Sequence, residues 1–195
     1  MNNSRKIKFI SIILISGMVA MTSFGQDNNT AIQNVVISVP EVALIDLEAN
    51  GGTNIQLSPQ APQEAGLAVD FSKQTNTGIW INYSSIVNSR TEPARNITAQ
   101  ITSGTVPQGM VLRVVAGKDA GMGDGAMGNA AAQINLNNQA QNIITGVGSA
   151  YTGNGVAKGH QLTYALALEN SNSAYAKLDF NQATTLAITY TMTDQ

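Results

Sequence analysis

The last stretch of the chain, residues 184–193, constrains the fold more than any other. It reads TTLAITYTMT, and four apolar side chains alternate in it with small or hydroxyl side chains: Leu186, Ile188, Tyr190 and Met192. Alternation with a period of two, in β-branched and aromatic residues, is typical of a β-strand with one buried face. We therefore expect a closing strand whose apolar face packs against another sheet.

The same alternation, or a short apolar run, recurs between turn signals along the chain. The segments are residues 42–47, 54–57, 67–71, 78–84, 96–102, 110–115, 132–136, 142–145, 162–168 and 175–180. Many short strands with polar turns indicate an all-β fold, and we expect an immunoglobulin-like antiparallel β-sandwich. A closed β-barrel is the alternative, because the pattern does not show whether a sheet closes on itself.

Residues 31–39 (AIQNVVISV) have the same pattern, with Val35, Ile37 and Val39 on one face and Pro40 after the run. Two interpretations are open. The segment is either the first strand of a complete sandwich or an arm that adds to the sheet of another chain. We favour the first, because the chain holds enough strands to close its own core.

The first 25 residues have the pattern of a secretory signal peptide. Three basic residues, Arg5, Lys6 and Lys8, precede an apolar run, and Ser23 and Gly25 provide small residues for a signal peptidase. The apolar run is too short for a stable membrane span, and a retained anchor is the alternative. We expect residues 1–25 to be removed and residues 26–195 to form a single β-sandwich domain, secreted to the periplasm or cell surface.

Charge and cysteine content exclude several classes of protein. Residues 1–25 carry three of the ten basic residues and none of the twelve acidic ones, so residues 26–195 have a net charge of −5. This balance gives no electrostatic surface for nucleic acid, and we expect no membrane insertion after signal removal. The chain has no cysteine, which excludes disulfides and a thiol nucleophile.

The sequence offers little material for catalysis. His160 is the one histidine, it follows Gly159 in an expected loop, and no serine occupies a G-x-S-x-G elbow. A lone loop histidine is more often structural than catalytic. We therefore expect no enzyme activity and no cofactor, and we assign no catalytic, cofactor-binding or metal-binding residue.

Two features have a binding interpretation beside a structural one. Residues 118–129, from Lys118 to Asn129, form an expected long mobile loop in which Asp119 and Asp124 offer oxygen ligands for Ca²⁺, although a solvated loop is the favoured interpretation. Trp80 faces away from Ile79 and Ile81 if that strand alternates. It is then an exposed platform for a sugar ring, although we favour a place in the core.

Three features define the layout of the chain: the signal-peptide pattern, the segment NVVISVPEVALIDL and the closing LAITYTMTD. In this layout the chain resembles small pilus or fimbria subunits of Gram-negative bacteria. The paired cysteines and penultimate tyrosine of many such subunits are absent, and Asp194 is penultimate here. The resemblance implies a cell-surface protein that associates with itself or with other subunits through edge strands. We therefore expect a structural or adhesive role, with a carbohydrate-binding or calcium-binding module as the alternative.

Overall fold

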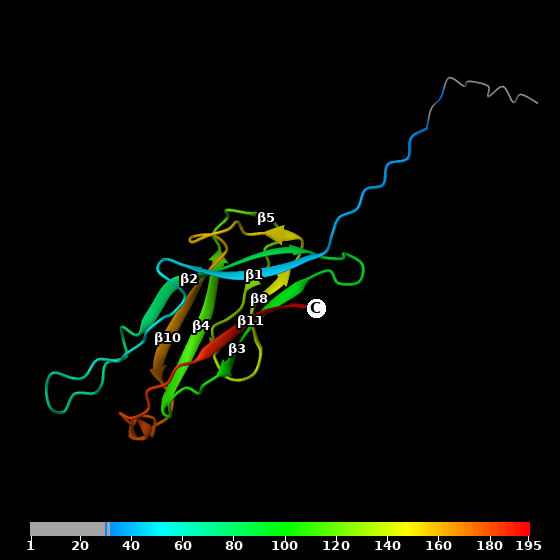
Figure 1. Cartoon of the computed structure of the whole chain (residues 1–195). Coiled ribbons are helices and arrows are strands. Elements are labelled where there is room, and N and C mark those ends of the chain that lie inside the picture. Colours follow the sequence, from blue (N-terminus) through cyan, green and yellow to red (C-terminus); the bar gives the residue numbers. More distant parts are fainter. Residues whose placement is uncertain (1–29, 31) are drawn as a thin grey trace, which may run out of the picture. The chain divides into compact units, whose positions relative to one another are not determined.

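The structure, a computed structural model, describes residue 30 and residues 32–195. The chain divides into two units, Met1–Ser38 and Val39–Gln195, and the second unit holds every strand of the described residues. The expected signal peptide lies outside the described residues. The strands are β1 (Val42–Ala49), β2 (Thr75–Ile86), β3 (Arg95–Ser103), β4 (Met110–Asp119), β5 (Asp124–Gly125), β6 (Asn129–Ala130), β7 (Ile134–Asn135), β8 (Gln141–Val147), β9 (Ala150–Tyr151), β10 (His160–Leu168) and β11 (Ala187–Asp194) (Figure 1).

The larger of the two sheets contains seven strands. Its order is β5-β9-β2-β10-β4-β7, and β1 also pairs with β2. Ser84 of β2 pairs with both Leu44 of β1 and Tyr151 of β9, so β1 and β9 lie on opposite sides of β2. All pairings in this sheet are antiparallel. Strand β1 is therefore a long edge strand of this sheet, and within the described residues no strand pairs with its outer side.

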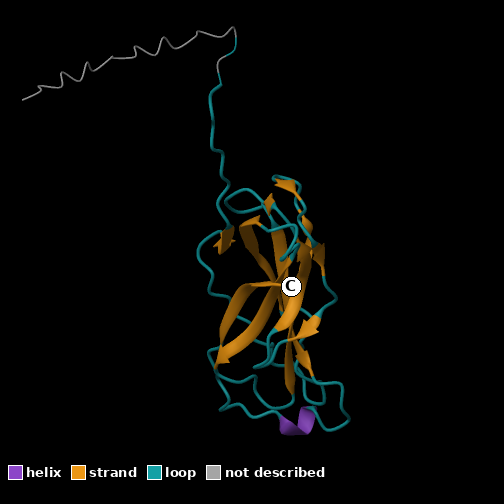
Figure 2. Ribbon diagram, turned by 90° about the vertical axis from the view of Figure 1, so that its right-hand side faces the viewer, coloured by secondary structure: helices purple, strands orange, loops and turns teal. Residues whose placement is uncertain are grey.

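The smaller sheet contains four antiparallel strands in the order β11-β3-β8-β6. Its outer strand β11 pairs with β3 from Ala187, opposite Ser103, to Asp194, opposite Arg95. Figure 2 shows the strands of both sheets forming one body, with the short 3₁₀ helix Tyr175–Lys177 at one end. The closing strand is thus also an edge strand.

The core lies between the two sheets and draws on the inward face of each long strand. In β2, Ile79, Ile81 and Tyr83 are buried, whereas the residues between them face the other side. The remaining members of the core are Ile97, Ala99, Ile101, Leu112, Val114, Ala116, Leu136, Ile143, Ile144, Val147, Leu162 and Tyr164. Leu186, Ile188, Tyr190 and Met192 pack against this core but stay partly exposed.

The structure confirms the expected all-β antiparallel sandwich, since its strands form two open sheets rather than one closed barrel. Seven of the expected strands correspond to long strands of the structure. They are residues 42–47 (β1), 78–84 (β2), 96–102 (β3), 110–115 (β4), 142–145 (β8), 162–168 (β10) and 184–193 (β11). Residues 132–136 contain only the short β7. The strands that were predicted correctly carry the inward residues of the core.

Four expected strands are wrong. Residues 32–39 contain no strand, so the segment at 31–39 is not the first strand of the sandwich, which is β1. Residues 54–57 have no ladder, although Ile55 and Leu57 pack against the core. Residues 67–71 make only one bridge, from Asp70 to Gln60. Residues 175–180 begin with the 3₁₀ helix. In each case the pattern correctly marks apolar side chains, but the segment has no neighbouring strand with which its backbone forms a ladder.

The expected long loop at residues 118–129 is also wrong, because the segment contributes to both sheets. It holds the end of β4, all of β5 and the start of β6. Its glycines permit close backbone packing. A Cβ atom at Gly123 would collide with the carbonyl oxygen of Tyr151, and one at Gly125 would collide with that of Ser149. Glycine here therefore serves close backbone approach as well as turning.

Candidate functional site

A row of side chains crosses the outer face of the larger sheet at the level of Ser84. The register places Leu44 of β1, Ser84 of β2, Tyr151 of β9 and Asp124 of β5 side by side on four adjacent strands. Residues paired in register point to the same face of a sheet, and Tyr83 and Ser85 point into the core. The row therefore faces outward. Leu44 is 65% exposed and Tyr151 is 55% exposed.

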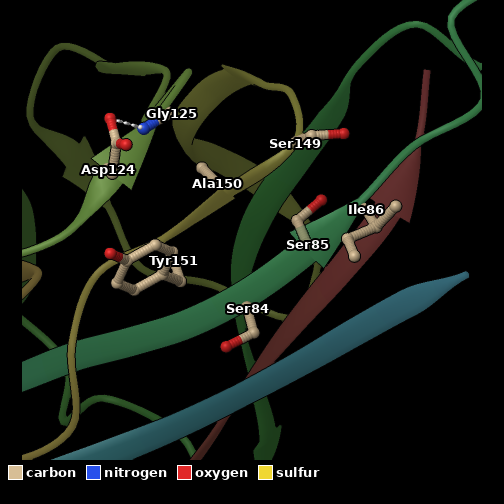
Figure 3. A pocket seen from close by; sticks show the side chains of 8 residues that line it. All are labelled: Ser84, Ser85, Ile86, Asp124, Gly125, Ser149, Ala150 and Tyr151. Carbon is tan, nitrogen blue, oxygen red and sulfur yellow. Dashed lines mark hydrogen bonds between the residues drawn. The ribbon is translucent and has the colours of Figure 1, made fainter. Parts of the chain in front are cut away.

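Two shallow hollows lie on either side of Tyr151. We call the pair of them the Tyr151 hollow. The first has a volume of about 460 Å³ and is lined by Ser84, Ser85, Ile86, Asp124, Gly125, Ser149, Ala150 and Tyr151 (Figure 3). The second has a volume of about 320 Å³ and is lined by Leu44, Ile45, Asp46, Asn82, Tyr83, Ser84, Tyr151, Gly153 and Asn154. Ser84 and Tyr151 belong to both, so the aromatic ring stands between them.

The residue after Tyr151 fixes the direction of its side chain. Thr152 is completely buried, its backbone N–H donates to the Tyr83 carbonyl at 3.1 Å, and its Oγ1 accepts the Tyr83 N–H at 3.0 Å. Because neighbouring side chains of an extended segment point to opposite faces, an inward Thr152 holds Tyr151 outward. On the other side of the ring lies β5, where Gly125 and the preceding Gly123 pack closely against the backbone of Ser149 and Tyr151. The local backbone thus positions the ring without help from a ligand.

The polar groups of the Tyr151 hollow are carboxylates, hydroxyls and amides. Asp124 lines one hollow and Asp46 the other. Asp124 accepts the Gly125 N–H through Oδ1 at 2.7 Å, as Figure 3 shows, and Asp46 accepts the Leu47 N–H at 2.8 Å. No lysine or arginine lines either hollow. The site is therefore a small apolar platform surrounded by hydrogen-bonding groups, none of them basic.

Trp80 does not belong to the core, which corrects the favoured expectation for this residue. It lies on the outer face of β2, opposite Glu48 of β1 and Gln161 of β10, where it is half-buried. The alternation of β2 gave its direction correctly. The openly exposed aromatic residue of the sheet is instead Tyr151, which was not predicted from the sequence. Its position in a turn-rich stretch, between Ser149 and Gly153, is the signal that could have drawn attention to it.

Asp119 and Asp124 stand in separate local structures. Asp119 ends β4, and its Oδ2 accepts the Gly121 N–H at 2.7 Å, whereas its Oδ1 is buried without a hydrogen-bond partner among the described residues. Asp124 belongs to β5. The described residues contain one group of three acidic side chains close enough to share an ion, and neither aspartate is a member of it. Asp119 and Asp124 therefore belong to no group of three acidic side chains within the described residues.

That group of three consists of Glu41, Glu92 and Asp194, and the guanidinium of Arg95 binds two of them. Arg95 is 1% exposed. Its side chain donates to Glu41 at 2.5 Å and to Asp194 at 2.7 Å. It also donates to the carbonyl oxygens of Val42 and Ile86. A cation of the chain itself therefore pairs with Glu41 and Asp194, and the arrangement joins β1, β2, β3 and β11.

Arg95 was not predicted from the sequence to be a buried residue, although a signal was present. Arg95 continues the inward series of Ile97, Ala99 and Ile101, so a basic residue occupies a core position. A charged residue on an apolar face requires partners there. Hydrogen bonding to Asp194 is the main cause that raises the pKa of Arg95, which keeps the guanidinium charged.

His160 is the first residue of β10 and is 1% exposed, so the expected loop position is wrong. Its Nδ1 donates to the carbonyl oxygen of Gly117 at 2.8 Å, and its Nε2 lies 2.9 Å from the hydroxyl of Tyr83. The two rings are stacked with centroids 5.7 Å apart. The Tyr83 hydroxyl donates its proton to the carbonyl of Met127. Through these contacts His160 and Tyr83 connect residues 118–129 to the core and stabilise the fold.

None of the helices in the described part of the chain has the length and apolar composition needed to cross a membrane. Comparisons with protein-family models, with curated proteins and with solved structures found no match for this chain.

Proposed function

We propose that this protein is an exported, non-catalytic structural protein of the cell surface, which assembles with further copies by β-strand addition. The observation that carries the proposal is the segment at residues 32–39. It alternates Val35, Ile37 and Val39 on one face, and these side chains are 71%, 85% and 72% exposed. The segment belongs to no sheet of the described residues. An apolar, extended and unpaired segment is suited to pair with a sheet edge of another molecule.

The edge strand β11 is suited to receive such a segment. Within the described residues it pairs only with β3, which leaves one row of backbone donors and acceptors without a strand. Its inward residues Ile188, Tyr190 and Met192 are only partly buried. They share the two-residue spacing of Val35, Ile37 and Val39. A strand added here would cover apolar surface from both partners and extend the smaller sheet.

The non-catalytic part of the proposal is supported by the state of the polar side chains. The one histidine is buried and bonded to Gly117 and Tyr83. Two members of the one group of three acidic residues in the described chain, Glu41 and Asp194, are bound by Arg95. Export is supported by the pattern of residues 1–25, which lie outside the described residues.

The test compares two substitutions on opposite faces of the same segment. Ile37→Asp places a charge on the face that would enter the partner, whereas Val36→Asp places it on the face that would point to solvent. We expect the exported protein and Val36→Asp to sediment as oligomers and Ile37→Asp to sediment as a monomer with an unchanged circular dichroism spectrum. A synthetic peptide of residues 32–39 should compete with oligomer formation.

A wild-type protein that stays monomeric at all concentrations would overturn the proposal, and so would equal effects of the two substitutions. Unfolding of Ile37→Asp would show that the segment completes its own sandwich, which is the interpretation that we favoured from the sequence.

A further inference from the structure

The position of Tyr151 distinguishes it from the other exposed aromatic residues. Tyr175 and Phe180 are also exposed, but Tyr151 alone of the three lines the two hollows described above. Tyrosine offers a flat apolar ring for stacking together with a hydroxyl group for hydrogen bonding. The ring is held outward by the buried Thr152 next to it. A ligand would therefore meet a platform that is already oriented, which lowers the entropy cost of binding.

The groups around the ring match a molecule with many hydroxyl groups. Carboxylates at both ends, Asp46 and Asp124, accept hydrogen bonds. The hydroxyls of Ser84 and Ser149 and the amide of Asn154 both donate and accept. The row from Leu44 to Asp124 spans three inter-strand steps, or roughly 14 Å. An extended ligand of alternating apolar and hydroxyl surfaces fits this row better than a compact one.

The charge of the site selects among such ligands. Two carboxylates and no basic residue line the hollows, and residues 26–195 have a net charge of −5. A ligand with carboxylate or sulfate groups would be repelled. From the ring, the acceptors and the charge we propose that the Tyr151 hollow binds a short neutral glycan, with one sugar ring stacked on Tyr151 and its neighbours bonded to Asp46 and Asp124. This site is separate from β11, so it does not depend on strand addition.

The test uses nuclear magnetic resonance of the ¹⁵N-labelled protein carrying Ile37→Asp, titrated with cellotriose, chitotriose, mannotriose and the acidic trigalacturonate. If that substitution does not yield a monomer, the same titration is made on the wild type by isothermal calorimetry. At least one neutral trisaccharide should give saturable binding, with shifts centred on Ser84, Asp124 and residues 149–154. Trigalacturonate should bind at least tenfold more weakly.

Variants then locate the binding. Tyr151→Ala should weaken it about tenfold or more, because the stacking surface is lost. Tyr151→Phe should stay within about threefold, because the ring remains. Tyr175→Ala, which removes an exposed ring beside the 3₁₀ helix, should leave the affinity unchanged. If Tyr151→Ala fails to fold, Asp46→Asn combined with Asp124→Asn replaces it and should weaken binding.

Several results would overturn the proposal. They are the absence of saturable binding by all neutral trisaccharides, shifts confined to other surfaces, equal affinity for Tyr151→Ala and wild type, and preference for the acidic trisaccharide. Concentration-dependent shifts at the hollow in the absence of sugar would also overturn it, because they would show that the hollow binds a second copy of the chain.

Discussion

The hydroxyl groups of Tyr164 in β10 and Tyr190 in β11 are hydrogen-bonded to each other, and this contact joins the two sheets. Burial raises the pKa of both hydroxyls above the ordinary value of 10.0. Burial, with a smaller contribution from the Asp119 carboxylate, also raises the pKa of Tyr83. Three tyrosines therefore stay protonated in the folded chain under conditions in which they ionise in the unfolded chain.

These tyrosines predict a loss of stability at high pH. A folded-state pKa above the unfolded value gives stability that is complete below the unfolded pKa and declines as the pH rises past it. Each such tyrosine lowers the free energy of unfolding by up to about 1.4 kcal/mol per pH unit above about pH 10. Urea unfolding from about pH 8 to pH 11 measures how steeply the free energy of unfolding falls with pH. Tyr164→Phe combined with Tyr190→Phe should make it shallower, and a flat profile for the wild type would contradict the prediction.

Arg95 predicts a second stability effect. Arg95→Met keeps the length of the side chain but leaves the carbonyl oxygens of Val42 and Ile86 without their donor. A buried acceptor that loses its partner costs about 1–3 kcal/mol, and because these two carbonyls are partly buried we expect a total loss of about 2 kcal/mol. Arg90→Met is the control, because Arg90 is exposed. Chemical denaturation of both variants decides the matter, and equal midpoints would show that Arg95 is dispensable.

The sequence predicted the long strands because their alternation reports the face that is buried. Ile79, Ile81 and Tyr83 of β2 are an example, and Ile97, Ala99 and Ile101 of β3 are another. The same alternation failed for residues 32–39, since a period of two shows that one face can be buried but does not supply a neighbouring strand. Segments that pack side chains without a ladder, such as Ile55 and Leu57, have the same ambiguity.

The candidate site was less predictable than the fold. Leu44, Ser84, Tyr151 and Asp124 come from four separate parts of the sequence, and only the register of β1, β2, β9 and β5 makes them neighbours. Register depends on contacts between distant segments, which a single sequence does not display. The inward position of Arg95 in β3 could be predicted from the sequence, because it follows from the local alternation alone.

Gly123 tests how residues 118–129 are packed. Gly123→Ala adds a Cβ atom that would collide with the backbone of Tyr151, and overpacking of this kind costs about 1–3 kcal/mol. Gly78→Ala is the matched control, because its Cβ would meet only the Asn76 side chain at ordinary contact distance. Thermal unfolding of the two variants should show a clear loss for Gly123→Ala alone. Equal melting temperatures would support the mobile loop that the glycine content suggested.

Residues 1–25 predict a processing event. Export should remove them, and the mature protein should begin at Gln26, because small residues occupy the positions that a signal peptidase recognises. Intact-mass measurement on protein recovered from the periplasm or the cell surface gives the answer directly. A mass that includes residues 1–25 would instead favour a retained membrane anchor.

The two ends of the described chain should differ sharply in their importance for folding. Removing residues 184–195 deletes β11, which pairs with β3 from Ala187 to Asp194. It also deletes the hydroxyl partner of Tyr164 and a carboxylate partner of Arg95. Burial of one large apolar side chain contributes about 1.5–3 kcal/mol, and a domain is stable by only about 5–15 kcal/mol. This deletion should therefore abolish cooperative unfolding.

Removing residues 30–39 should leave the melting temperature of the monomer unchanged, because the segment belongs to no sheet and its apolar side chains are exposed. Circular dichroism melts of both deletions at low protein concentration provide the comparison. A peptide of residues 184–195 added to the shorter protein should restore a cooperative transition, since the edge of β3 would again be paired. If the peptide of residues 32–39 restored it as well, the two segments would be interchangeable at that edge. An unfolded protein after removal of residues 30–39 would instead make the segment part of the sandwich, and strand addition between copies would lose its donor.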